Sequence, residues 1–271
     1  MRRASRGGSV AGGVSARRGS IGGVPRALLV LATLLLLAVP PAAEARRGRT
    51  HAKSTTARIL LAGAWAEVRW TDGDTFRVLS GPHAGRTARL VGVNALESFG
   101  PVHRWGGLPA TFYLSIAKKS AAVAAAASVR CDADGRPDGY GRLLAVCPEV
   151  AEALVRAGHA MVFAVDGPPD PRLVALQRDA QRLGTGMWAG GAPPLVPTSL
   201  HSADEPDLGP RGAYDRVADT RTGVTEVRPH HRVYRPCEEV CVGEGAERAC
   251  MTYVPFARRY RDRPACLRGR P

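Results

Sequence analysis

The stretch from Thr71 to Ser98 most constrains this chain, because it joins a turn signal to a run of charged and amide side chains. It reads TDGDTFRVLSGPHAGRTARLVGVNALES. The Asp72-Gly73 pair is a strong hairpin signal between segments that alternate in polarity. We therefore predict a meander of three strands over these ranges: Ala66–Trp70, Thr75–Leu79 and Thr87–Val93.

The third predicted strand carries an arginine among apolar residues. With a period of two, Arg89 shares a face with Val91 and Val93, which is an unusual place for a guanidinium unless an anionic group lies beside it. Carboxylates and an amide stand at the ends of the same strands. We expect four side chains to converge there and form a site: Asp74, Arg89, Asn94 and Glu97.

Residues 1–45 have the pattern of a secretory signal peptide. An arginine-rich segment, Met1–Arg26, precedes the apolar run Ala27–Val39, and Ala43-Glu44-Ala45 offers a small-residue cleavage site. A transmembrane helix needs about 20 apolar residues, so a membrane span is the weaker interpretation of this run. We expect a secreted, periplasmic or envelope protein with no membrane span left after cleavage.

The chain is strongly basic, with a formal net charge of +14. Removal of the predicted signal peptide takes away six arginines and one glutamate, which leaves a net charge of +9. Such an excess suits a polyanion partner such as nucleic acid, although a basic exported protein can equally bind an anionic envelope. Because a GC-rich genome also explains much of the arginine bias, charge alone does not decide the partner.

All six cysteines lie beyond the predicted signal peptide, and an even number in an oxidising compartment favours disulfides. Cys131 and Cys147 stand on two short strands joined by a turn-rich excursion, which would place them within disulfide reach. The other four crowd the C-terminus: Cys237, Cys241, Cys250 and Cys266. With His230 and His231 nearby, a zinc site is a less favoured alternative for these four.

The order of the remaining elements predicts an α+β domain followed by two shorter segments. Helical patterns cover three ranges: Ala110–Ser128, Glu149–Ala157 and Pro171–Leu183. With the strands, these fit a small barrel of antiparallel strands capped by helices over residues 57–190. Residues 46–56 have the composition of a disordered leader and residues 191–235 that of a linker. Residues 236–271 form a cysteine-rich tail, too short to hold a core without disulfides.

Five motifs in one order and spacing resemble the staphylococcal nuclease (thermonuclease-like) family: DGDT, ARLVGVNALE, GYGRLLAV, EALVRAGHA and GMW. The resemblance extends over the range Ile59–Trp188. It implies an OB-type five-stranded barrel with three helices. It also implies calcium-dependent cleavage of phosphodiester bonds in DNA and RNA.

The resemblance implies a set of calcium ligands. Asp74, Asn94 and the main-chain carbonyl of Ala95 fall on the family's ligand positions, and calcium prefers oxygen donors of these kinds. One position departs from the family, which expects aspartate where this chain has Asn94. Asparagine keeps an oxygen donor but removes one negative charge beside the ion, so we expect weaker metal binding and a slower or inactive enzyme.

The resemblance also implies groups that handle the phosphate and the attacking water. Arg89 and Arg142 match the two guanidinium positions that hold the reacting phosphate, where planar donor forks stabilise developing negative charge. Glu97 matches the carboxylate that activates or orients the water. A further set matches positions around the phosphates of the bound nucleotide: Tyr140, Lys118 and Lys119.

Three functions are consistent with these features. The first is an exported, monomeric, calcium-dependent endo- or exonuclease that cleaves DNA or RNA with little sequence preference. The second is a catalytically degenerate barrel that binds nucleic acid or an envelope partner without cleavage. The third is an envelope adhesion protein whose cysteine-rich tail is the interaction module. Both arginines and Glu97 favour the first function, whereas Asn94 favours the second.

Overall fold

The structure is a computed structural model that describes residues 55–206, 208–209, 212–259 and 261–267. The predicted signal peptide, residues 1–45, lies outside the described residues. The predicted leader, residues 46–56, also lies outside them apart from Thr55 and Thr56. Thr56 is already the first residue of a strand, so the structured domain begins one residue earlier than predicted.

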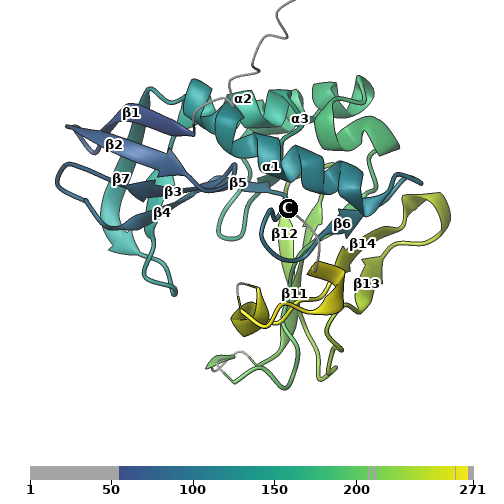
Figure 1. Ribbon diagram of the computed structural model, residues 1–271. Helices are drawn as coiled ribbons and strands as arrows, with labels where there is room; N and C mark the ends of the chain where they lie inside the picture. The colour runs from purple at the N-terminus through teal and green to yellow at the C-terminus, as the bar shows by residue number, and fades with distance from the viewer. Residues whose placement is uncertain (1–54, 207, 210–211, 260, 268–271) are drawn as a thin grey trace, which may run out of the picture. The chain divides into compact units, whose positions relative to one another are not determined.

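Six strands close into a barrel in the order β1-β2-β3-β4-β8-β7 (Figure 1). Their bounds are β1 (Thr56–Leu61), β2 (Ala64–Trp70), β3 (Thr75–Val78), β4 (Thr87–Leu90), β7 (Arg130–Pro137) and β8 (Leu143–Val146). The pairs β1–β7 and β4–β8 are parallel, and the other pairs are antiparallel. Because side chains alternate along β2, Ala66, Val68 and Trp70 are buried in the barrel core.

This architecture confirms the predicted α+β class, with an OB-type barrel and three helices. The closed sheet has six strands instead of five, because the chain doubles back between β1 and β2. Ala62 and Gly63 both have positive φ, at 48° and 83°, as in the tight primed turns of hairpins. An Ala-Gly pair is a weak signal for such a turn, since alanine rarely adopts positive φ.

The third predicted strand is broken at Val91 and continues in a different sheet. Beyond this residue, β5 (Gly92–Ala95) pairs with β9 (Ala160–Phe163) outside the barrel. Gly92 has a φ of 85°, which side chains other than glycine rarely adopt, and the valine before it is 47% exposed. The expectation that this valine shares an inner face with Arg89 is therefore wrong.

Three helices accompany the barrel: α1 (Ala110–Ala126), α2 (Pro148–Arg156) and α3 (Pro171–Arg182). Their bounds agree with the three predicted ranges to within two residues. α1 buries small side chains such as Ala117, Ala121 and Ala124, so it can approach the barrel closely. A Cβ atom placed on Gly73 would lie only 2.7 Å from the Cβ of Ser120 on α1. Within the described ranges, no helix has the length and apolarity needed to cross a membrane.

The segment that we predicted to be a linker, residues 191–235, is folded. It forms a three-stranded sheet of β10 (Leu195–Leu200), β11 (Tyr214–Asp219) and β12 (Thr225–Pro229). Val196 and Ala218 of this sheet belong to one buried cluster with Trp105 and Trp188. The linker prediction is wrong because much of the apolar cover of this sheet comes from other parts of the chain.

A buried glutamine fastens this sheet to the rest of the domain. Gln177 on α3 is fully buried, accepts a hydrogen bond from the Val162 N–H at 2.7 Å and donates one to the Thr220 carbonyl at 2.6 Å. Gln181 donates to the same carbonyl at 3.0 Å from a half-buried position. The turn between β11 and β12 is thus hydrogen-bonded to α3, and α3 to β9.

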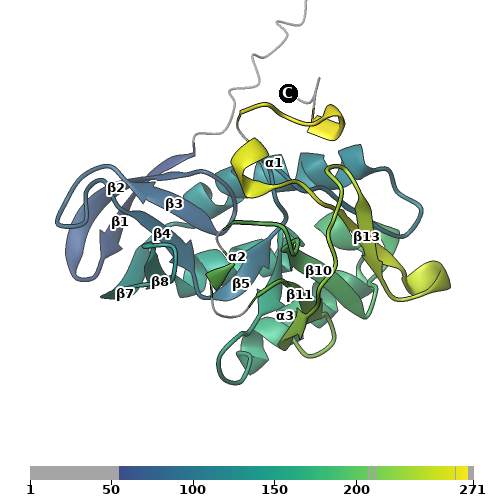
Figure 2. The same cartoon turned by 90° about the horizontal axis from the view of Figure 1, so that it is seen from below.

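The tail contributes to a third sheet, formed by β13 (Glu239–Val242), β14 (Ala249–Thr252) and β6 (His103–Arg104). The last C-terminal turns lie beside α1 (Figure 2), where Leu114, Arg263 and Leu267 line one small cavity. The disulfides are Cys131–Cys147, Cys237–Cys266 and Cys241–Cys250. The predicted disulfide between β7 and the end of β8 and the predicted stapling of the tail are both confirmed.

Candidate functional site

Asp74 lies directly before β3 and is 6% exposed. Its carboxylate accepts hydrogen bonds from Thr75 Oγ1 at 3.1 Å and from the Ala95 N–H. Its Oδ2 also lies 2.9 Å from Nη1 of Arg89, because the antiparallel register of β3 and β4 places Thr75 opposite Arg89. Asp74 therefore ties the hairpin to both β4 and β5.

Arg89 is surrounded by oxygen atoms. Its side chain is 13% exposed and donates to Asn94 Oδ1 at 2.9 Å, to the Val93 carbonyl at 3.0 Å and to the Leu90 carbonyl at 3.3 Å. The predicted anionic neighbour of this guanidinium is Asp74. One half-buried cation thus holds together the hairpin and the bend that follows β4.

Asn94 and Ala95 stand on β5, and their predicted ligand atoms are engaged in hydrogen bonds. Asn94 Oδ1 accepts from Arg89, while Asn94 Nδ2 donates to the Ala95 carbonyl at 3.0 Å. An aspartate at this position could not donate the second bond. The departure from the family is therefore also a difference in structure, because the amide nitrogen covers a carbonyl that the resemblance assigns to calcium.

Asp72 belongs to the same cluster, although we interpreted it only as a turn residue. It is half-buried, and its Oδ1 accepts a hydrogen bond from the Asp74 N–H at 3.1 Å. Burial raises the pKa of the Asp72 carboxyl well above its usual range, and the negative charges of Asp74 and Glu97 raise it further. The signal for Asp72 was present in the paired acidic residues of the DGD motif.

Glu97 lies within electrostatic reach of the same cluster and pairs with a residue from the tail. Its Oε2 is 3.7 Å from Nη1 of Arg259, with side-chain exposures of 39% for Glu97 and 18% for Arg259. Removal of water by the surrounding protein raises the pKa of Glu97, and Arg259 is the strongest influence in the opposite direction. Nothing in the sequence indicated Arg259, because its proximity depends on the fold of the tail.

Arg142 lies in the turn before β8 and is anchored by a carboxylate. Its Nη2 and Nε are 2.7 Å and 2.8 Å from Asp138 Oδ2, and its side chain is 31% exposed. Its positive charge lowers the pKa of Glu97, so the two side chains lie within electrostatic reach. Its guanidinium carbon lies 5.3 Å from the ring centroid of Tyr140, which is 67% exposed.

The two lysines of the predicted set lie on α1 and are exposed. Ser120, the next residue, is buried and faces Gly73 of the hairpin. Lys118 and Lys119 therefore stand on a helix that borders the hairpin, but their side chains are directed to solvent. The structure joins Asp74, Arg89, Asn94 and Ala95 by hydrogen bonds, and it places Glu97 within electrostatic reach of Asp74, Arg89 and Arg142.

The oxygen donors of this cluster fit a hard divalent cation such as calcium. Asp72 and Asp74 bring two carboxylates to the hairpin. Burial raises the pKa of Asp72, and the charges of Asp74 and Glu97 raise it further. Such a group favours a bound cation, since calcium takes six to eight oxygen ligands, carboxylates among them. Asn94 Oδ1 and the Ala95 carbonyl can join only as further acceptors beside the hydrogen bonds that they already receive.

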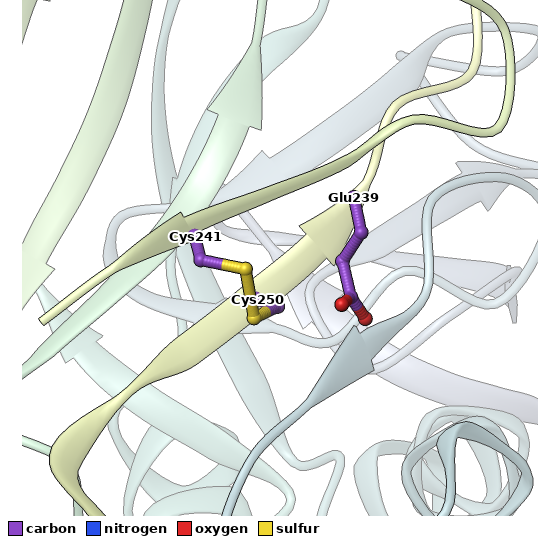
Figure 3. Close-up of side chains that lie close together, drawn as sticks. All are labelled: Glu239, Cys241 and Cys250. Atoms are coloured by element: carbon purple, nitrogen blue, oxygen red, sulfur yellow. A yellow bond between two sulfur atoms is a disulfide. The ribbon is translucent and has the colours of Figure 1, made fainter. Parts of the chain in front are cut away.

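The zinc alternative for the tail is wrong. All four tail cysteines are in disulfides, so no thiolate remains to bind the metal. Glu239, Cys241 and Cys250 do lie close together (Figure 3), but the two sulfur atoms are bonded to each other. The Glu239 carboxylate is paired with Arg104, whose Nε lies 2.8 Å from Oε1.

The fold and this cluster define a class: an α+β barrel protein whose buried arginine, carboxylates and amide form a polar site where β3, β4 and β5 meet. Residues 87–190 match the family model described as staphylococcal nuclease homologue. These residues are thus similar to staphylococcal nuclease homologues, and the predicted resemblance is confirmed. No curated protein matches the chain. The match begins at Thr87, so Asp74 precedes it, whereas Arg259 and the sheet β10-β11-β12 follow it.

Proposed function

We propose that this protein is an exported, calcium-dependent phosphodiesterase that cleaves DNA or RNA with little sequence preference. The observation that carries the proposal is the pair of Arg89 and Asp74, 2.9 Å apart, with Glu97 within electrostatic reach of both and of Arg142. Cleavage of a phosphodiester by water needs cations for the phosphate and a carboxylate for the water. These four side chains supply both. The match to a nuclease family supports a polynucleotide substrate.

In the proposed reaction, Arg142 binds the non-bridging oxygens of the phosphate, because its partly exposed guanidinium keeps donors beyond those paired with Asp138. Arg89, more deeply buried, orients the bend and adds positive charge. Glu97 accepts a proton from water as the water oxygen bonds to phosphorus and one P–O ester bond breaks. The leaving oxygen takes a proton from solvent, which gives a phosphomonoester and an alcohol.

Calcium would be held by the carboxylates of Asp74 and Asp72, with Asn94 and the Ala95 carbonyl as further oxygen donors. A bound divalent ion would neutralise charge that develops on the phosphate. The residues themselves provide the binding and orientation. Arg89 and the Ala95 N–H fix the Asp74 carboxylate, so its position is set by the fold before any ligand binds.

A second function is favoured by one observation. Asn94 carries no charge, and its amide nitrogen hydrogen-bonds the Ala95 carbonyl at 3.0 Å, where the family has an acidic side chain and a ligand. A barrel with a weakened metal site could bind nucleic acid, or an envelope partner, without cleaving it. Retention of cleavage separates the first function from this one.

The test is digestion of supercoiled plasmid and of structured RNA by the purified chain without residues 1–45. We expect both substrates to be cut with millimolar calcium and to stay intact with EDTA. Arg142→Gln should reduce the rate about 100-fold or more, as loss of a charge that stabilises the transition state does. Arg156→Gln, an exposed position on α2, removes the same charge and should retain the rate. Intact polynucleotides in calcium would refute the proposal.

Export rests on the pattern of residues 1–45 and on the three disulfides, which form and persist in oxidising compartments. We further propose that the mature chain acts as a monomer. Sedimentation of the purified chain and mass mapping of the secreted product test these two statements, and a cytoplasmic, reduced protein would contradict the first.

A further inference from the structure

β11 lies in the segment that follows the nuclease-like match and approaches the candidate site at Tyr140. Tyr214, the first residue of β11, lies within electrostatic reach of the Tyr140 hydroxyl and adds to the rise in its pKa that burial causes. Tyr214 is 5% exposed, and its ring lies 4.5 Å from the ring of His201, centroid to centroid. A buried and packed tyrosine therefore lies near an exposed one.

Each of these two tyrosines is accompanied by an arginine. The guanidinium carbon of Arg142 is 5.3 Å from the Tyr140 ring centroid, and that of Arg216 is 5.4 Å from the Tyr214 ring centroid. Both positive charges act on the Tyr140 hydroxyl. The four side chains thus form a continuous row that leads from Arg142, at the candidate site, onto β11.

Arg216 differs from the other arginines near the site, because no carboxylate among the described residues pairs with it. Arg89 pairs with Asp74, Arg142 with Asp138 and Arg259 with Glu97. Within the part of the chain that the structure describes, Arg216 makes no ion pair, and its buried Nε has no hydrogen-bond partner. A half-buried guanidinium with open donors is suited to bind an anion from outside the chain.

We propose that Tyr140, Tyr214 and Arg216 form a second subsite for one polynucleotide strand. Arg216 binds a backbone phosphate near the one that is cleaved, and the exposed ring of Tyr140, with Tyr214 beside it, stacks on a base. Base–aromatic stacking and contacts of arginine with phosphate are the usual means of binding single strands without sequence preference. This inference rests on the proposed function, since it takes the same substrate, and it assigns part of the binding to β11.

The first test measures binding in EDTA, so that it does not depend on cleavage. The anisotropy of a fluorescein-labelled single-stranded oligonucleotide reports the dissociation constant of the mature chain at several salt concentrations. For Arg216→Gln we expect binding about fivefold weaker and a slope of log K against log salt smaller by about 0.7, the value for one lost phosphate contact. Arg156→Gln, the matched control, should leave affinity and slope unchanged.

Two conservative variants separate binding from folding. Arg216→Lys keeps the charge and should retain the salt slope while losing part of the affinity, because lysine lacks the planar fork. Tyr214→Phe keeps the ring against His201 but removes the hydroxyl, so affinity should fall about twofold to threefold with the salt slope unchanged. A wild-type slope and affinity in folded Arg216→Gln would overturn the inference.

The second test separates this inference from the proposed function. A nitrophenyl ester of thymidine 5′-phosphate presents one phosphodiester and no neighbouring phosphate. Arg216→Gln should raise KM for the oligonucleotide about fivefold and leave hydrolysis of the small ester unchanged. If the wild type cleaves neither substrate but the salt slopes differ as expected, the proposed function fails and the subsite stands. If the wild type cleaves both and the variant matches it on both, the subsite alone fails.

Discussion

The Asn94 side chain accepts a hydrogen bond from Arg89 at 2.9 Å and donates one to the Ala95 carbonyl at 3.0 Å. This bridge is the main difference between the site and the calcium site that the family resemblance implies. It replaces a charge–charge contact by a neutral amide, and it places a hydrogen-bond donor on a carbonyl that could otherwise face a cation. Substitution of Asn94 therefore tests directly whether this bridge weakens calcium binding.

Asn94→Asp should tighten calcium binding. The carboxylate adds a negative charge and has no donor for the Ala95 carbonyl, so we expect the dissociation constant to fall about tenfold, which corresponds to about 1.4 kcal/mol. Isothermal titration calorimetry of the mature chain measures it. Asp72→Asn is the opposing variant and should weaken binding. Unchanged calcium affinity in Asn94→Asp would show that this position does not limit the site.

Arg259→Gln should lower kcat more than it changes KM. Arg259 lies 3.7 Å from the carboxylate of Glu97, so its loss frees the candidate base from the position that the tail gives it. We expect kcat for an oligonucleotide to fall about tenfold, and Arg259→Lys to restore part of it. Stability should change by less than about 1 kcal/mol, because the pair is partly exposed. An unaltered kcat would mean that the tail does not position Glu97.

Gln177→Leu should destabilise the whole domain by about 2 to 4 kcal/mol, because it leaves the buried Val162 N–H without a partner and removes the shorter of two hydrogen bonds to the Thr220 carbonyl. Urea unfolding without reductant measures the change. Gln181→Leu, which removes a half-buried bond to the same carbonyl, is the matched control and should cost less than about 1 kcal/mol. Equal effects of the two variants would contradict the role of Gln177 in fastening β11 and β12.

His103 should make the domain less stable in acid. It is 1% exposed, its Nε2 lies 2.9 Å from the Pro197 carbonyl, and burial lowers its pKa from 6.5 to about 4. The unfolded state therefore binds a proton between these two values while the folded state does not. Stability is complete above pH 6.5 and falls as the pH drops toward 4, by at most about 3 kcal/mol.

Urea unfolding at pH 7 and at pH 5 measures this dependence. His103→Gln removes the titrating group, so the loss of stability between the two pH values should be smaller in the variant than in the wild type. The same loss in both proteins would show that other groups cause the acid sensitivity.

The barrel and the three helices could be predicted because their signals are local. The Asp72-Gly73 turn, the alternation along β2 and the alanine-rich pattern of α1 each fix a short segment by itself. The sheet β10-β11-β12 could not be predicted in this way. Its own sequence is poor in large apolar residues, and side chains such as Trp105 and Trp188 complete its core. The composition of residues 191–235 therefore resembles that of a linker, although the segment folds through long-range contacts.

The residues of the site also fall into those that local sequence signals indicated and those that only long-range contacts bring there. Asp74, Arg89, Asn94 and Glu97 lie close together in sequence, and hydrogen bonds at the ends of β3, β4 and β5 bring the first three together. Arg259 and Arg216 reach the region only through the folded tail and β11, so no spacing in the sequence indicated them. The bend at Gly92 also escaped prediction, because a glycine between valines reads as part of one continuous strand.

The central claim is that Glu97 serves a metal-dependent cleavage of polynucleotides. The most direct measurement is the initial rate of cleavage of a single-stranded oligonucleotide over a calcium titration, for the wild type and for Glu97→Gln side by side. We predict that the wild-type rate saturates with calcium. The rate of the variant should be lower by a factor of about 100 or more, since a carboxamide accepts no proton from water. A wild type that leaves the oligonucleotide whole at every calcium concentration, or a variant that cleaves as fast as the wild type, would contradict the account.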